Sequence, residues 1–381
     1  MRILVLSDLP QFVTGGAERQ AANLIEAWLD AGHEVTCFGR RMGASQVTIG
    51  AHSIQVRKIH TLQRCGRALR AASYFVSLAR LLFLHRQRFD VIYTRFLGEA
   101  AATAALMKSL RMLDVPLVST PANTGGEGDA NFLAGLPFHR RLVRLLDAQC
   151  NAINLIAPAM ADELRRIGFS GQNFSQIPNG VSIHDAPSGA QPRRHSMVAV
   201  GRLTPQKGYD VLIDALALNR ANLRSGVVRI IGDGPDREAL QAQARDMRVD
   251  HAITWLGELS HDDALLEMEH AQVFLLPSRY EGMSNAGLEA MEKGLAMLAT
   301  RCGGLDTFIQ QDMGWIVEPG DVGSLSLALQ QVLRSPASQL VGMGSKNRAL
   351  VIQEFGMTAV ADRYLTLFNR LVERRRTKSE S

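Results

Sequence analysis

The first 18 residues read MRILVLSDLPQFVTGGAE and set the expectation for the fold. Residues 3–7 form an apolar run of strand length, the loop after them ends in Gly15-Gly16, and a helical pattern covers residues 17–31. Gly32 follows this helix, and glycine readily adopts the left-handed conformation of a C-terminal cap. A strand, a glycine turn and a helix open the doubly wound type of parallel sheet.

The same alternation of strands and helices continues and then begins again. In the first half it predicts further strands at residues 34–38, 91–94, 117–120 and 153–157. In the second half it predicts a strand at 196–200, a loop ending in Gly208, and a helix through about Leu218. Later strands are predicted at 227–231, 253–256, 273–276 and 296–300. The chain therefore reads as two similar α/β units.

Residues 185–195 are rich in Pro, Gly and small polar residues, which is typical of a domain linker. We therefore predict two Rossmann-like doubly wound domains at 1–184 and 196–355. A C-terminal helix at 356–381 is expected to pack back on the first domain and to end in a basic tail. Ligands of such sheets bind beyond the carboxyl ends of the strands, so the two domains are expected to face a shared cleft.

The composition is that of an ordinary globular protein, with 381 residues, 46% of them hydrophobic and 21% charged. The N-terminal apolar run is too short for a signal peptide, and the apolar stretch 74–84 is interrupted by Arg80 and too short to span a bilayer. We therefore expect a cytoplasmic protein. Its four cysteines form no Cys-x-x-Cys pair and no His-Glu-x-x-His is present, so we expect reduced thiols and no zinc site.

Residues 35–89 contain no Asp or Glu, although they carry ten Arg and Lys residues. Apolar side chains, including Leu69, Tyr74, Leu78 and Phe83, lie among these cations. This pattern suits a surface that meets anionic lipid headgroups, and the alternative is a solvated helix face. Nucleic acid ranks last because the segment has no recognised motif. The pattern slightly favours peripheral docking on a membrane.

The strongest local motif is PSRYEGMSNAGLEAM at residues 277–291, directly after a predicted strand. Glu281 lies in the loop and Glu289 on the following helix, so the two acids can reach opposite ends of one ligand. The N–H groups of Met283, Ser284 and Asn285 lie at the helix start, where they suit an anionic or hydroxyl-rich group. The alternative is that Ser284 is an ordinary cap and both glutamates are surface charges.

A second motif, GRLTPQKG at residues 201–208, also follows a predicted strand. Arg202 and Lys207 flank a tight turn, and two cations held in this way suit a diphosphate. Two solvated loop cations would be the simpler explanation if the loop stood alone. The acidic motif on a later strand of the same sheet favours the phosphate role.

With these motifs the chain resembles the family 4 glycosyltransferases, which are retaining enzymes of GT-B architecture. The resemblance covers nearly the whole chain, and the Glu281 motif together with the Arg202/Lys207 loop is specific. The matching pieces are Gly15-Gly16-Ala17-Glu18, Val200-Gly201-Arg202, Lys207-Gly208, Ile231-Gly232-Asp233-Gly234-Pro235, Trp255-Leu256-Gly257, residues 281–289 and Gly303-Gly304. Gly232-x-Gly234 alone could pass for a dehydrogenase fingerprint, but Pro235 follows and the third glycine is missing.

The resemblance implies a nucleotide-diphosphate-sugar donor bound mainly by the second domain, with a UDP-sugar favoured, and a lipid-linked or polysaccharide acceptor on the first. It also implies retention of anomeric configuration and no catalytic metal or other cofactor. The resemblance further implies that Arg202 and Lys207 hold the diphosphate. It implies that Glu281 holds the donor sugar, together with the N–H groups of Met283, Ser284 and Asn285. Glu289 would bind the ribose, the backbone near Leu259 would face the nucleobase, and Gly16 would let the N-terminal loop approach the donor.

One departure concerns the loop at residues 121–129, where many relatives carry a histidine close to the donor sugar. This chain has a glycine-rich acidic loop there, with no histidine before His139. Glu127 or Asp129 is a candidate base, and an acceptor loop without catalytic duty is an equal alternative. Because this histidine is missing, an alternative is that the protein is a non-catalytic partner that binds nucleotide sugars for another transferase.

Overall fold

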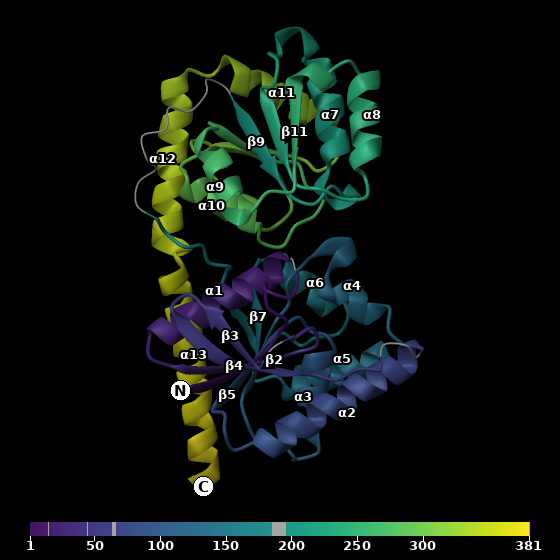
Figure 1. The fold of residues 1–381 in the computed structure, drawn as a ribbon, viewed down its shortest axis with the longest axis vertical. Coiled ribbons are helices and arrows are strands. Elements are labelled where there is room, and N and C mark those ends of the chain that lie inside the picture. Colours follow the sequence, from purple (N-terminus) through teal and green to yellow (C-terminus); the bar gives the residue numbers. More distant parts are fainter. Residues whose placement is uncertain (14, 44, 63–65, 185–195, 381) are drawn as a thin grey trace. The chain divides into compact units, whose positions relative to one another are not determined.

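The computed structural model describes residues 1–13, 15–43, 45–62, 66–184 and 196–380. It divides into two α/β units, one formed by Met1–Gly180 with Met357–Ser381 and the other by Val181–Gly356 (Figure 1). Each unit contains its own sheet, so the predicted fold class is confirmed. The predicted linker 185–195 lies outside the described residues.

The first unit contains an eight-stranded sheet with the order β3-β4-β2-β1-β5-β6-β7-β8. All neighbouring strands are parallel except β3 and β4, which form an antiparallel hairpin at one edge. Its strands are β1 (Arg2–Leu6), β2 (Glu34–Gly39), β3 (Gln46–Ile49), β4 (His52–Lys58), β5 (Val91–Arg95), β6 (Leu117–Thr120), β7 (Ala152–Leu155) and β8 (Phe174–Gln176).

Helices cover this sheet, and the C-terminal helix of the chain is one of them. Trp28 on α1, Tyr93 on β5, and Tyr364 and Phe368 on α13 form a buried aromatic cluster, so α13 belongs to the core of the first unit (Figure 1). The helices are α1 (Gly16–Asp30), α2 (Arg67–His85), α3 (Glu99–Ser109), α4 (Asp129–Ala134), α5 (His139–Gln149), α6 (Met160–Arg166) and α13 (Met357–Glu380).

The second unit contains a six-stranded parallel sheet with the order β11-β10-β9-β12-β13-β14. Its strands are β9 (Met197–Val200), β10 (Val228–Ile231), β11 (Ile253–Gly257), β12 (Val273–Leu276), β13 (Ala296–Thr300) and β14 (Gly314–Val317). Its helices are α7 (Tyr209–Leu218), α8 (Arg237–Asp246), α9 (His261–Glu269), α10 (Asn285–Glu292), α11 (Val322–Arg334) and α12 (Ala337–Glu354).

The basic segment 35–89 spans β2, the β3–β4 hairpin and α2, so its cations are spread over several elements. Tyr74, Leu78 and Leu82, at helical spacing on α2, are buried in the core. The amphipathic pattern of α2 therefore arises largely from packing within its own unit. Leu69 and Phe83 remain 60% and 40% exposed and give α2 an apolar surface component.

No helix in the described part of the chain is long and apolar enough to cross a membrane. Cys37, Cys150 and Cys302 are free thiols, and Cys65 lies outside the described residues. No set of three or more His, Cys, Asp or Glu side chains arranged to hold a metal occurs among the residues that the structure describes.

Candidate functional site

The two loops that the sequence singles out leave neighbouring strands of the second sheet. β9 pairs with β10 on one side and with β12 on the other, so the direction of the strand order reverses between β9 and β12. Ligands of doubly wound sheets bind beyond the carboxyl ends of the strands at such a point. The loops at residues 201–208 and 277–284 both begin there.

Hydrogen bonds join these two loops. The Arg279 N–H donates to the Gln206 carbonyl oxygen at 2.7 Å, and Gln206 Nε2 donates to the Tyr280 carbonyl oxygen at 3.1 Å. The Arg279 guanidinium bonds both carboxylate oxygens of Asp210 at 2.7 and 2.6 Å, and these bonds hold the pKa of Asp210 below its ordinary value. The second loop is thereby anchored to the start of α7.

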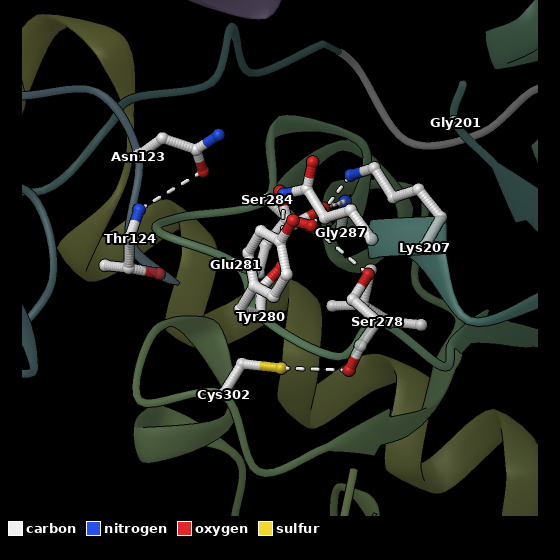
Figure 2. Close-up of polar contacts among 12 residues, drawn as sticks. Asn123, Thr124, Gly201, Lys207, Ser278, Tyr280, Glu281, Ser284, Gly287 and Cys302 are labelled. Atoms are coloured by element: carbon white, nitrogen blue, oxygen red, sulfur yellow. Dashed lines mark hydrogen bonds and ion pairs between the residues drawn. The ribbon is translucent and has the colours of Figure 1, made fainter. Parts of the chain in front are cut away.

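An ion pair lies at the centre of the site. Lys207 Nζ lies 2.7 Å from Glu281 Oε2, and the two side chains are only 18% and 13% exposed. The hydroxyl of the fully buried Ser278 donates to the same carboxylate oxygen at 3.2 Å. Figure 2 shows Lys207 and Ser278 pointing toward Glu281. Both contacts use Oε2, so Oε1 remains able to accept a hydrogen bond from a ligand hydroxyl.

Ser278 is held in turn by the last residue of β13 and by a residue just after that strand. Its carbonyl oxygen accepts a hydrogen bond from Thr300 Oγ1. It also accepts one from Cys302 Sγ at 3.1 Å, which Figure 2 shows. Burial raises the pKa of the Cys302 thiol to about 11, so the thiol is protonated at neutral pH and can donate. No local pattern predicted the contact of Ser278 with Thr300 and Cys302, because it depends on the pairing of β12 with β13.

Glycines allow the loops of the site to approach one another closely. Gly208 has φ = +65°, and a Cβ there would lie 2.1 Å from the Pro277 carbonyl oxygen. A Cβ on Gly304 would lie 1.7 Å from the Gly282 carbonyl oxygen. A side chain at Gly208 would push the loop that holds Lys207 away from the loop that holds Glu281. A side chain at Gly304 would push the loop after β13 away from the loop that holds Glu281.

Glu289 lies on α10 and faces the loop after β11. Its Oε1 is 3.9 Å from His261 Nδ1, at the first residue of α9, and its side chain is 18% exposed. Leu259 belongs to the same loop and is half-buried. The structure therefore brings the predicted ribose acid close to the loop predicted to face the nucleobase. His261 is a further residue of this region that the sequence reasoning missed.

The residues at the start of α10, whose N–H groups are predicted to bind a ligand, already make contacts in the structure. The Ser284 hydroxyl accepts a hydrogen bond from the Gly287 N–H at 3.1 Å, so it caps the helix. Met283 and Asn285 each take part in an interaction of their own. The simpler interpretation of Ser284 as a helix cap therefore holds for its side chain.

Arg202 is exposed, and its side chain makes no hydrogen bond or ion pair with any described residue. It therefore differs from Lys207, which is already paired. Gly16, the remaining predicted site residue, lies in the first unit as the first residue of α1.

Asp129 has a structural role in the first unit. Its carboxylate accepts hydrogen bonds from the Leu97 N–H at 2.7 Å and the Ala122 N–H at 2.9 Å. Burial raises its pKa, and backbone hydrogen bonds oppose this effect. These bonds hold the 121–129 loop against the end of β5, which accounts for Asp129 without a role as a base. The side chain of Glu127 lies outside the described part of the structure.

Two family models match the chain in succession. Residues 14–185 match the model described as Glycosyltransferase Family 4, and residues 182–349 match the model described as Glycosyl transferases group 1. Together they cover residues 14–349, which include every predicted site residue.

Similar proteins include enzymes of several glycan pathways. A glycogen synthase of Mycobacterium tuberculosis is 27% identical over 369 residues, which cover 89% of this chain and 87% of that enzyme. The lipopolysaccharide core biosynthesis glycosyltransferase LpsE of Rhizobium meliloti is 24% identical over 233 residues, covering 60% of this chain and 66% of that enzyme.

Solved structures share the fold at low sequence identity. Sucrose-phosphate synthase of Thermosynechococcus elongatus has a TM-score of 0.79 at 18% identity, covering 97% of this chain and 99% of that chain. HepE of Anabaena, solved with UDP-glucose, has a TM-score of 0.76 at 18% identity, covering 97% of this chain and 100% of that chain.

Proposed function

Because this chain belongs to the GT-B glycosyltransferases, we propose that it transfers a sugar from a UDP-sugar to a glycan or lipid-linked acceptor with retention of anomeric configuration. The observation that carries the proposal is the joining of the Lys207 loop and the Glu281 loop at the switch point of the second sheet. A cation and a carboxylate held 2.7 Å apart suit the junction between a diphosphate and its sugar.

In this proposal, Arg202 and Lys207 bind the diphosphate, and Glu281 Oε1 accepts hydrogen bonds from sugar hydroxyls. The bond between the sugar C1 and the β-phosphate oxygen breaks, and the electron pair leaves with UDP. The acceptor oxygen bonds to C1 on the same face, and its proton passes to the departing phosphate oxygen. Negative charge grows on the phosphate during this step, so fixed cations stabilise the transition state more than the bound donor.

We propose that the two cations do this without a resident metal, and that direct attack by the acceptor on the same face requires no protein nucleophile. Glu289 and the loop containing Leu259 bind the ribose and the base. Their nearness to each other supports this assignment, since ribose and base are adjacent in any nucleotide.

Calorimetry with UDP, GDP and ADP on the purified full chain tests the donor class. UDP should bind most tightly, and EDTA should leave both binding and turnover unchanged. NMR of the product formed from an α-linked UDP-sugar should show an α-linkage. Preference for GDP would refute the UDP assignment, an inverted product would refute retention, and UDP binding without transfer or hydrolysis would favour the non-catalytic alternative.

We also propose that the protein is cytoplasmic and docks on anionic membranes through α2. Leu69, Val76 and Leu84 on this helix are each at least 60% exposed, and Arg70 and Arg80 are exposed beside them. Basic side chains near an anionic surface contribute about 1 kcal/mol each, and salt screens this attraction.

Flotation with vesicles containing phosphatidylserine tests the docking proposal. The protein should float with them at low salt and separate at about 0.5 M salt, where the Debye length is a few ångströms. Val76→Glu should weaken flotation, whereas Leu218→Glu, at a position 65% exposed in the second unit, should not. Equal flotation of both variants, or no flotation of the wild type, would remove this proposal.

A further inference from the structure

The first unit contains a pocket of about 460 Å³ that the donor site does not use. It lies at the carboxyl ends of β1, β2 and β5, where a doubly wound sheet binds ligands. Its lining combines carboxylates and aromatic rings: Asp8, Glu18, Glu99, Asp129, Phe38, Tyr74, Phe96 and Phe132, with Arg40 and Arg95 as its cations.

The charges of the lining do not cancel. Arg40 lies 4.0 Å from Glu99, and the buried Arg95 lies in the electrostatic field of Asp129. The lining thus has four carboxylates against two cations, and neither Asp8 nor Glu18 forms an ion pair with a described residue. Glu18 makes no side-chain hydrogen bond with any described residue, and Asp8 accepts only the Arg41 N–H, at 2.8 Å, within the described chain. Both therefore keep lone pairs for ligand hydroxyls.

The Tyr74 hydroxyl responds to the same excess of negative charge. Burial raises its pKa, and the carboxylates of Glu99 and Asp8 raise it further, against an opposing effect of Arg40. An anionic ligand placed among these groups would meet the same repulsion.

Two phenylalanines at the mouth supply apolar faces. Phe132 on α4 is 53% exposed, and Phe96, directly after β5, is 38% exposed. Phe96 has φ = +77°, which is costly for a bulky residue, by about 1–3 kcal/mol. Its backbone is held there by hydrogen bonds with Thr120 and Ser119. Phe96 therefore lines the pocket from a strained backbone position that these hydrogen bonds hold.

We propose that this pocket binds the acceptor as a hydroxyl-rich ring without an anionic group, stacked on Phe96 and Phe132 and hydrogen-bonded by Asp8 and Glu18. Carboxylates accept from sugar hydroxyls, and the C–H face of a sugar ring packs against an aromatic face. The inference rests on the proposed function, because it names the class of acceptor for that transfer. It places phosphorylated rings and uronic acids outside the accepted class.

Binding of ring probes to the full chain, measured by saturation-transfer NMR titration, tests this proposal. The probes are methyl α-glucoside, methyl α-galactoside, methyl α-mannoside and myo-inositol, each compared with its phosphorylated counterpart. At least one neutral ring should bind, and its phosphorylated counterpart should bind roughly tenfold more weakly or not at all. A phosphorylated ring that binds as well as the neutral one would overturn the proposal.

Variants identify the pocket as the place of binding. Phe132→Ala should lower the affinity for the neutral ring by roughly five- to tenfold. Phe138→Ala, at a residue that is 76% exposed and lies outside the pocket, should leave this affinity unchanged. Glu18→Gln should reduce the discrimination against phosphate, whereas Glu373→Gln on the exposed face of α13 should not.

Gly98→Trp is a steric test, because a Cβ at Gly98 meets no atom within 4 Å and Gly98 lines the pocket. This variant should abolish ring binding while preserving the melting temperature. Ring binding that survives Gly98→Trp would place the ring elsewhere and overturn the proposal.

UDP calorimetry on the same samples separates this inference from the proposed function. If UDP binds and no neutral ring does, the acceptor inference is wrong and the donor assignment stands. If none of UDP, GDP and ADP binds, the proposed function itself is refuted.

Discussion

Lys207→Ala and Arg202→Ala should reduce turnover similarly but affect stability differently. Both cations are proposed to hold the leaving diphosphate, so each loss removes one preorganised charge from the transition state. In the unliganded protein, however, Lys207 is paired with Glu281 at 2.7 Å, whereas the Arg202 side chain contacts no polar partner among the described residues. Only the lysine variant should therefore destabilise the second unit.

The magnitudes follow from the burial of the pair. Loss of one preorganised donor typically slows turnover about 10²–10³-fold, or about 2.7–4 kcal/mol of activation free energy. The side chains of the Lys207–Glu281 pair are 18% and 13% exposed, so the burial of this pair is intermediate between that of surface pairs and that of fully buried pairs. Its loss should cost about 1–3 kcal/mol, since Ser278 still bonds the remaining carboxylate. For a unit of this size the melting temperature should fall by roughly 2–12 °C.

The assay measures turnover with saturating donor together with a melting curve for each variant. Arg202→Ala should melt within about 2 °C of the wild type, as expected for an exposed side chain. Arg202→Lys should recover only part of the turnover, because a point charge does not reproduce bidentate geometry. Normal turnover in both alanine variants with intact melting would show that this loop does not hold the leaving group, and the site assignment would have to be abandoned.

Three further predictions concern the geometry around this pair. Gly208→Ala should destabilise the second unit by at least about 1 kcal/mol in a denaturant titration, since φ is +65° and the new Cβ meets a carbonyl; an unchanged midpoint would refute this. Asp210→Asn should lower stability at pH 7, and this loss should shrink as pH falls, because the Arg279 contact holds the folded-state pKa of Asp210 below its ordinary value. The stabilisation is present above the unfolded-state pKa and is lost as pH falls through the folded-state pKa; a pH-independent loss would contradict the mechanism. Glu289→Ala should weaken UDP binding in calorimetry, whereas Glu281→Ala should mainly lower turnover, and equal losses of UDP affinity would refute this division.

The strands that the sequence analysis missed all lie at or next to an edge of a sheet, although β11, also an edge strand, was predicted. The predicted strands at 117–120, 273–276 and 296–300 have the same bounds in the structure, and every residue of these three strands is buried. β3, β4, β8 and β14 were missed. β3 and β4 alternate buried and exposed residues over only a few positions, and β8 has no fully buried residue, so none gives a clear apolar run.

The site residues were predictable only where the motif itself carries them. Glu281, Glu289, Arg202 and Lys207 lie in two short motifs, and their loops are adjacent because β9 and β12 are adjacent. The contacts of Cys302 and His261 depend on which strands and helices pair, which no local pattern specifies. The basic segment shows the opposite error, since Tyr74, Leu78 and Leu82 follow a surface-like pattern and yet belong to the core.

The Lys207–Glu281 pair connects sugar recognition with leaving-group stabilisation in the proposed mechanism. Before the donor binds, each charge compensates the other, so neither is left buried and unpaired. A diphosphate competes with Glu281 for the Lys207 ammonium. The sugar hydroxyls can then take the place of this ammonium as hydrogen-bond donors to the Glu281 carboxylate. UDP alone offers only the first of these exchanges and leaves Glu281 without its cation, whereas a UDP-sugar offers both. We therefore expect Glu281→Gln to bind UDP at least as tightly as the wild type while losing most of its preference for UDP-sugar over UDP. Calorimetric titration of this variant with the two ligands measures that preference, and an unchanged ratio would show that the pair does not couple the two ends of the donor.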